Sequence, residues 1–160
     1  MNRNPEAPES QRGQALNLEI IDDEDLAVAS ALLQDAVVSG PDMEWHKGRR
    51  RFVILANRFR WEAGNFGVET KREPERVRSL LVINSVLGVS FRGISQPEAG
   101  DILCVLSLTF EPAASPGGYL RFRLAGGATL RLEVECLDMI FKDVTRPYVA
   151  PSGSVPFHDA

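Results

Sequence analysis

Hydrophobic and polar residues alternate along most of the chain with the period of two that is typical of half-buried strands. The pattern starts at Leu16, Leu18 and Ile20, which alternate with Asn17 and Glu19. It returns in segments 42–46, 51–61, 76–83, 86–92, 102–110, 119–124 and 129–135, which are separated by turn-forming residues. Each segment therefore predicts a strand, and consecutive strands are expected to form hairpins.

Two segments have a helical period instead. After the first strand, Asp22 or Asp23 can cap a helix, and the apolar residues recur at helical spacing until Ser39, Gly40 and Pro41. These apolar residues are Leu26, Ala29, Leu33, Ala36 and Val37. Near the C-terminus, Leu137, Ile140, Phe141 and Val144 follow the spacing i, i+3, i+4 and i+7, which predicts a short helix packed on the sheet.

This order of elements predicts an α+β domain and contains no alternating strand–helix–strand units. We expect a strongly bent antiparallel sheet or a small open barrel of about seven to eight strands, with one helix after the first strand. Along the strand 51–61, we expect Val53, Leu55 and Phe59 to face the core. The predicted organisation is a disordered leader over 1–15, a single domain over 16–146 with a mobile hairpin loop at 62–75, and a flexible tail over 147–160.

Composition fits an ordinary soluble domain, with 44% hydrophobic and 25% charged residues among 160. The hydrophobic runs are too short for a transmembrane helix, and the N-terminal residues lack an apolar targeting segment. We therefore expect a cytoplasmic protein with no membrane partner, in which Cys104 and Cys136 are buried free thiols.

Charge is unevenly distributed within a net charge of −4. The first 40 residues contain eight acids against two arginines, whereas residues 41–100 contain eleven basic residues against seven acids. The densest basic run is a candidate partner-binding patch formed by Lys47, Arg49, Arg50 and Arg51. Its alternatives are an intramolecular role, a solvated turn, or nucleic-acid binding, which the acidic net charge disfavours.

Candidate chemistry is sparse. His46 and His158 have no Ser or Cys partner in sequence, and no zinc-ligand pair is present. The acidic cluster Glu133, Glu135 and Asp138 could act in acid–base chemistry or hold a hard cation, although the same pattern is typical of solvent-facing carboxylates. We expect no cofactor and no metal.

Two amides are candidate polar groups of an apolar ligand pocket between the bent sheet and a helix. Asn57 stands between Leu55 and Phe59, on the side of its strand that we expect to face the core, and Asn84 stands at a strand break. The simpler interpretation of Asn57 is an amide satisfied by nearby backbone groups.

The segments DEDLAVASALLQDAVV, RRRFVILANRFRWE, SVLGVSFRGI, LSLTFEP, PGG and LRLEVECLD resemble, in this order, a bacterial family catalogued as domain of unknown function 2948. The resemblance spans residues 16–144. It implies a small cytoplasmic protein and supplies no reaction, cofactor or ligand.

These observations predict a non-enzymatic cytoplasmic module that binds a protein partner or associates with itself. The alternative is a domain that binds a small apolar ligand. A carboxylate-based or metal-dependent enzyme and a nucleic-acid binder are weaker hypotheses.

Overall fold

The computed structural model describes residues 14–63, 75–94 and 100–149. These residues form one α-helix, α2 (Asp23–Leu33), and eleven strands. The strands are β1 (Asn17–Ile20), β2 (Val37–Ser39), β3 (Met43–His46), β4 (Arg51–Phe59), β5 (Glu75–Ile83), β6 (Val86–Arg92), β7 (Ile102–Pro112), β8 (Gly118–Leu124), β9 (Thr129–Val134), β10 (Met139–Asp143) and β11 (Tyr148–Val149). Short 3₁₀ turns occupy η1 (Gly40–Asp42), η2 (Lys47–Arg49) and η3 (Trp61–Ala63).

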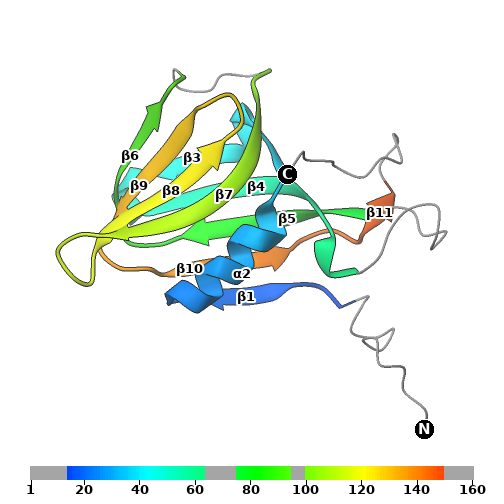
Figure 1. Cartoon of the computed structure of the whole chain (residues 1–160), viewed down its shortest axis with the longest axis horizontal. Coiled ribbons are helices and arrows are strands. Elements are labelled where there is room, and N and C mark those ends of the chain that lie inside the picture. The colour runs from blue at the N-terminus through cyan, green and yellow to red at the C-terminus, as the bar shows by residue number, and fades with distance from the viewer. Residues whose placement is uncertain (1–13, 64–74, 95–99, 150–160) are drawn as a thin grey trace, which may run out of the picture.

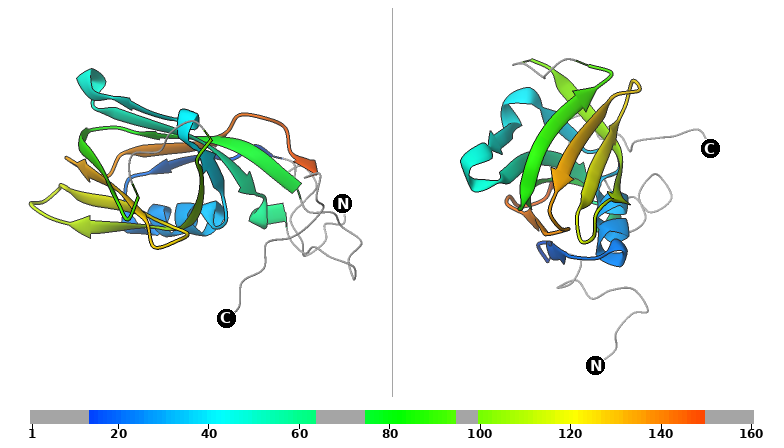
Figure 2. Two further views of the ribbon diagram at one scale, coloured as in Figure 1. Left: turned by 90° about the horizontal axis from the view of Figure 1, so that it is seen from above. Right: turned by 90° about the vertical axis from the view of Figure 1, so that its left-hand side faces the viewer.

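All eleven strands belong to one open sheet with the order β1-β10-β5-β4-β2-β7-β8-β9-β6, in which β3 also pairs with β4 and β11 with β5. Every strand pair is antiparallel. The sheet curls so that β7, β8, β9 and β6 form one layer in front of β4, β5 and β10 (Figures 1 and 2). Helix α2 lies beside β7 and β1, and the apolar core fills the space between the layers.

Antiparallel pairing and a single helix after the first strand confirm the coarse prediction, but the sheet has more strands than predicted. The predicted segments 76–83 and 86–92 correspond to β5 and β6. The additional strands are β2, β10 and β11, which lie in segments predicted as helix or tail. The predicted leader, loop and tail fall mostly on 1–13, 64–74 and 150–160, which lie outside the described residues.

Helix α2 begins as predicted and ends earlier. The Asp22 side chain accepts a hydrogen bond from the Asp25 backbone N–H at 2.8 Å, which caps the helix. The helix stops at Leu33, and Asp35 adopts a left-handed conformation with φ 66°. The prediction that Ala36 and Val37 continue the helix was wrong, because the chain turns at Asp35 and pairs with β7.

The predicted C-terminal helix was also wrong, because residues 139–143 form strand β10 between β1 and β5. Met139 and Phe141 are buried, whereas Ile140 and Lys142 face outwards. The four apolar residues fit both a helical spacing and a buried strand, and such short runs cannot be assigned from periodicity alone.

Over residues 52–58, strand β4 presents to the core the face opposite to the predicted one, whereas Phe59 is buried as predicted. Phe52, Ile54, Ala56 and Arg58 are all buried. Val53, Leu55 and Asn57 are half-buried on the outer face. The inversion follows from Arg58, which the sequence pattern assigns to solvent.

We predict that Gly118→Ala destabilises the protein by about 1–3 kcal/mol, because it overpacks a filled site. A Cβ at Gly118 would lie 2.6 Å from the Phe110 ring and would also overlap the Glu111 carbonyl oxygen. The matched control is Gly48→Ala, whose Cβ would meet nothing within 4 Å. Urea unfolding measures both variants, and equal stabilities would contradict the packing described here.

Candidate functional site

The predicted basic patch lies at the turn between β3 and β4. Lys47 to Arg49 form η2, and Arg50 closes the turn in a left-handed conformation with φ 51°. Arg50 forms an ion pair with Glu135, and Arg51 Nε donates to Asn84 Oδ1 at 3.1 Å. Lys47 and Arg49 are exposed and form no ion pair with the described residues.

Backbone hydrogen bonds explain why residues of the predicted basic patch and of the predicted acidic cluster meet Asn84 at this corner. Val86 N–H donates to the Arg50 carbonyl at 2.8 Å, and Glu135 N–H donates to the Ser85 carbonyl at 2.9 Å. The turn from β5 to β6 is thereby held between the β3–β4 turn and the end of β9. Two members of the basic patch are thus engaged within the molecule, which agrees with the intramolecular alternative for this patch.

The predicted acidic cluster is divided. Glu135 faces Arg50, Glu133 is exposed on the outer face of β9, and Asp138 contributes its carbonyl to Asn84 N–H at 2.9 Å. Across 14–63, 75–94 and 100–149, no group of three or more His, Cys, Asp or Glu residues is placed to hold a metal ion. Within these ranges, the three carboxylates offer no shared coordination site.

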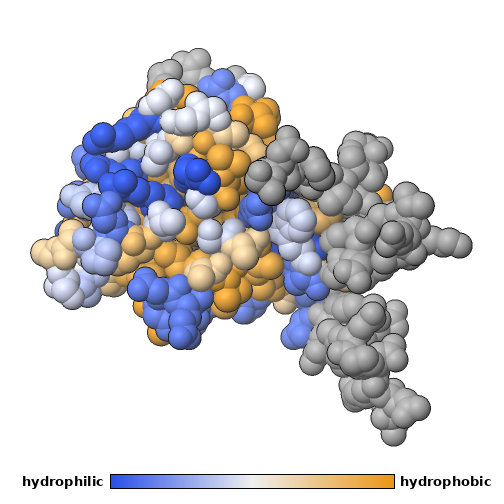
Figure 3. Space-filling view, in the orientation of Figure 1, coloured by the Kyte–Doolittle hydropathy of each residue, from blue (hydrophilic) through white to orange (hydrophobic). Residues whose placement is uncertain are grey.

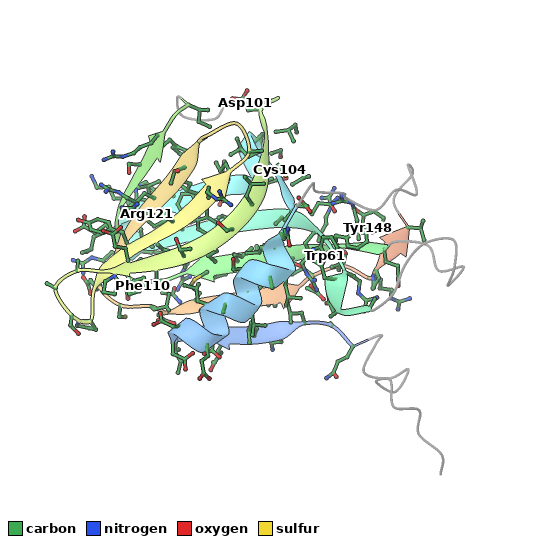
Figure 4. All side chains as sticks on the ribbon, in the orientation of Figure 1. Trp61, Asp101, Cys104, Phe110, Arg121 and Tyr148 are labelled. Atoms are coloured by element: carbon green, nitrogen blue, oxygen red, sulfur yellow. The ribbon has the colours of Figure 1, made fainter. Side chains whose placement is uncertain are left out.

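A group of basic residues that the sequence analysis missed covers the layer formed by β6, β9, β8 and β7. We call it the arginine face, defined by Arg92, Arg121, Arg123 and Arg131. The registers place these side chains on the surface that points away from the core. Hydrophilic residues gather over β6, β8 and β9 in Figure 3, and Figure 4 labels Arg121 among them.

The register sorts the arginine face into two rows across the strands. One row contains Ser90, Arg131, Arg121 and Thr109, and the next contains Arg92, Thr129, Arg123 and Ser107. Arg121 and Arg131 are therefore direct cross-strand neighbours, an arrangement of like charges that lowers sheet stability. The two rows lie two residues apart along each strand, or about 6.8 Å.

Neighbouring groups orient these guanidinium groups. Arg121 Nη2 forms an ion pair with Glu111 Oε2 at 2.5 Å, while its buried Nε has no hydrogen-bond partner in the part of the chain that the structure describes. The Arg131 guanidinium lies 4.5 Å from the centre of the Tyr119 ring. Arg123 Nε donates to Ser107 Oγ at 3.3 Å. Several donors therefore remain open for carboxylate or phosphoryl oxygens, to which arginine binds in bidentate fashion.

The predicted pocket residue Asn57 lies on the outer face of β4, on the side away from α2. Its placement between the sheet and a helix was wrong. Asn57 Nδ2 donates to Tyr148 Oη at 2.5 Å, and its buried Oδ1 has no hydrogen-bond partner within 14–63, 75–94 and 100–149. Asn57 does line a pocket of about 190 Å³ on this face. Asn84, in contrast, is bound to Arg51.

A buried ion cluster joins β4, β5 and β10. Arg58 is 0% exposed, and its guanidinium donates to Asp143, Glu62 and Ser79. Asp143 Oδ2 also accepts the Leu16 backbone N–H at 2.8 Å. Burial by itself lowers the pKa of Arg58, but the hydrogen bonds and charges of Glu62 and Asp143 outweigh it, so the pKa is raised. Because its donors are occupied, we assign this cluster a structural role.

Among the described residues, the remaining reactive side chains do not assemble into a catalytic group, and His158 lies outside the described residues. Cys104 and Cys136 are free thiols and only partly buried, less than predicted. Burial, followed by the nearby Asp35 charge, raises the pKa of Cys104, which keeps the thiol protonated and poorly nucleophilic. His46 Nε2 lies 2.9 Å from Glu44 Oε2 at the surface.

Residues 16–158 match the family model described as Protein of unknown function (DUF2948). The chain belongs to this family. The match confirms the resemblance carried by the sequence segments. Comparison with curated proteins and with solved structures found no match. Among the described residues, no helix of this family member is long and apolar enough to cross a membrane.

We predict that Arg58→Met costs about 3–5 kcal/mol of unfolding free energy, because it leaves the carboxylates of Asp143 and Glu62 without their buried cation. The control is Arg123→Met on the arginine face, expected to change stability by less than about 0.5 kcal/mol. Urea unfolding at neutral pH measures both. A stability loss for Arg58→Met no larger than that of the control would contradict the role assigned to the cluster.

The cluster also predicts acid sensitivity. Burial raises the pKa of Glu62, but the hydrogen bonds and charge of Arg58 outweigh it and lower the pKa below its ordinary value of 4.5. A carboxyl with a depressed folded-state pKa stabilises the protein above its unfolded pKa and loses that contribution as pH falls through the folded pKa. Unfolding at a series of pH values should show a shallower acid dependence for Glu62→Gln than for the exposed control Glu133→Gln. Identical pH slopes would exclude this coupling.

Proposed function

We propose that this chain is a non-enzymatic cytoplasmic module that binds an acidic segment of a partner protein on its arginine face. The observation that carries the proposal is the cross-strand pair Arg121 and Arg131. Two cations held side by side on an exposed sheet repel each other, and an anion between them relieves that repulsion.

The spacing of the arginine face favours an extended polypeptide. Its two rows are separated by about 6.8 Å along the strands, which is also the distance between alternate side chains of an extended chain. A segment lying along β8 and β9, with acidic residues at positions i and i+2, would therefore meet one row with each carboxylate. The hydroxyl groups beside the arginines supply further donors to the same oxygens.

The carboxylates at one end of the face favour a short acidic segment over a nucleic acid. Beyond the row of Arg121 and Arg131, the next row contains Glu111 and Glu133. A phosphate backbone continuing along the strands would meet these two negative charges. A short acidic segment can end before them, and the net charge of −4 also opposes general nucleic-acid affinity.

We predict that a fluorescent hexaglutamate peptide binds the full chain at low salt and that Arg121→Gln/Arg131→Gln weakens binding at least about tenfold, because charged hydrogen bonds are lost. Fluorescence anisotropy measures the affinity. The matched control is Lys47→Gln/Arg49→Gln, which removes the same charge from the β3–β4 turn and should bind almost as tightly as the unmodified protein.

Three outcomes would contradict this proposal. The first is no peptide binding at low salt, and the second is an equal loss in the two double variants. The third is tighter binding of a single-stranded oligonucleotide than of the peptide, with a log–log salt slope of about −0.7 for each phosphate contacted. That result would make the face a nucleic-acid interface.

A further inference from the structure

A second surface, separate from the arginine face, contains a small pocket where β2 lies between β4 and β7. The pocket has a volume of about 190 Å³ and lies on the outer side of the sheet. Its lining consists of Val37, Ser39, Asp42, Leu55, Ala56, Asn57, Arg78 and Ile102. The register places Asn57 beside Val37 on one neighbouring strand and beside Arg78 on the other.

One part of the lining is aliphatic. Val37 and Leu55 are half-buried on the outer face, and Ile102 is 63% exposed. An isoleucine with this exposure gains burial when an apolar group enters the pocket. At about 30 Å³ for each water in the liquid, the volume corresponds to about six waters, below the range of drug-sized ligand sites.

The Asn57 amide has an unused hydrogen-bonding atom. Nδ2 donates to the Tyr148 hydroxyl, whereas the buried Oδ1 has no partner among the described residues. Exchanging the two amide atoms by rotation would pair Oδ1 and leave Nδ2 unpaired. A buried amide atom without a partner lowers stability, and a ligand that reaches it restores the missing hydrogen bond.

Two opposite charges line the same pocket without neutralising each other. Asp42 Oδ2 accepts a hydrogen bond from Ser39 Oγ at 2.8 Å. Hydrogen bonds to Thr145 Oγ1 and from Val144 N–H fix the Arg78 backbone. Within the described residues, neither Asp42 nor the Arg78 guanidinium belongs to an ion pair.

We propose that this pocket binds a free aliphatic α-amino acid. The ligand ammonium group donates to Asp42 and, once the amide turns its oxygen toward the pocket, to Asn57 Oδ1, and the ligand carboxylate accepts from the Arg78 guanidinium. The aliphatic side chain packs on Val37, Leu55 and Ile102. A zwitterion matches the paired charges, which a purely apolar ligand would leave buried and uncompensated. This activity does not depend on the arginine face.

The first test titrates the isotope-labelled full chain with L-leucine and follows backbone amide signals by NMR. We expect saturable shifts at the pocket residues. Two leucine fragments separate the charged contacts: 4-methylpentanoate lacks the ammonium group, and 3-methylbutylamine lacks the carboxylate. Each should bind at least about tenfold more weakly than leucine.

Variants assign each charge to its residue. Arg78→Gln should weaken leucine binding at least about tenfold and leave 3-methylbutylamine binding unchanged. Asp42→Asn should weaken leucine and leave 4-methylpentanoate unchanged. This crossed pattern cannot arise from a general loss of folding. The matched control Arg123→Gln removes an arginine from another surface and should bind leucine normally.

Three results would overturn the proposal. The first is the absence of saturable shifts at the pocket up to about 10 mM leucine, because weaker binding lies far below the affinity of common small-ligand sites. The second is equal binding of leucine and 4-methylpentanoate, and the third is equal effects of Arg78→Gln and Arg123→Gln on leucine binding. None of these results depends on whether the arginine face binds acidic peptides.

Discussion

The buried guanidinium of Arg58 is the constraint on which the arrangement of β4, β5 and β10 depends. It is 0% exposed and binds carboxylates from β10 and η3 and a hydroxyl from β5. Asp143 also accepts a hydrogen bond from the Leu16 backbone N–H, so the residue that precedes β1 is held at the same cluster. A charge in this position is tolerated because its donors are filled, and removing one partner would leave an unpaired buried ion.

This cluster also explains why sequence patterns failed where they did. A prediction from alternation places charged residues on the outward face of a strand. Because Arg58 is charged but buried, the two faces of β4 were exchanged in the prediction, and Asn57 was assigned to the core side. The Asp143 side chain is 3% exposed, and the extended strand places it on the same face as the buried Met139 and Phe141, where it pairs with Arg58. In the predicted helix, Asp143 would be an ordinary surface acid. Long-range pairing thus overrode the local period in both segments.

Local signals were sufficient elsewhere. The cap at Asp22, the strand break at Asn84 and Ser85, and the hairpin of β8 and β9 each depend on neighbouring residues, and each was predicted. The site residues depended on distant partners. Arg50 meets Glu135 and Arg51 meets Asn84 across 85 and 33 residues of sequence. The two alternating arginines of YLRFRL and the single arginine of TLRLEV hinted at the arginine face, but the contribution of Arg92 follows from the β6–β9 pairing alone.

The cations of this protein therefore differ in their degree of compensation. Carboxylates neutralise Arg58 inside the fold and Arg50 at a surface corner. Arg121 and Arg131 face each other, and within the described residues a single carboxylate, Glu111, is paired with one of them. A sheet stabilised by an extensive core tolerates this local repulsion, because surface charge pairs contribute little to folding. An anion bound between Arg121 and Arg131 would lower the repulsion energy between these two side chains. Arg121 and Arg131 are consequently the arginines for which we propose anion binding, on an outer face separate from the buried cluster of Arg58.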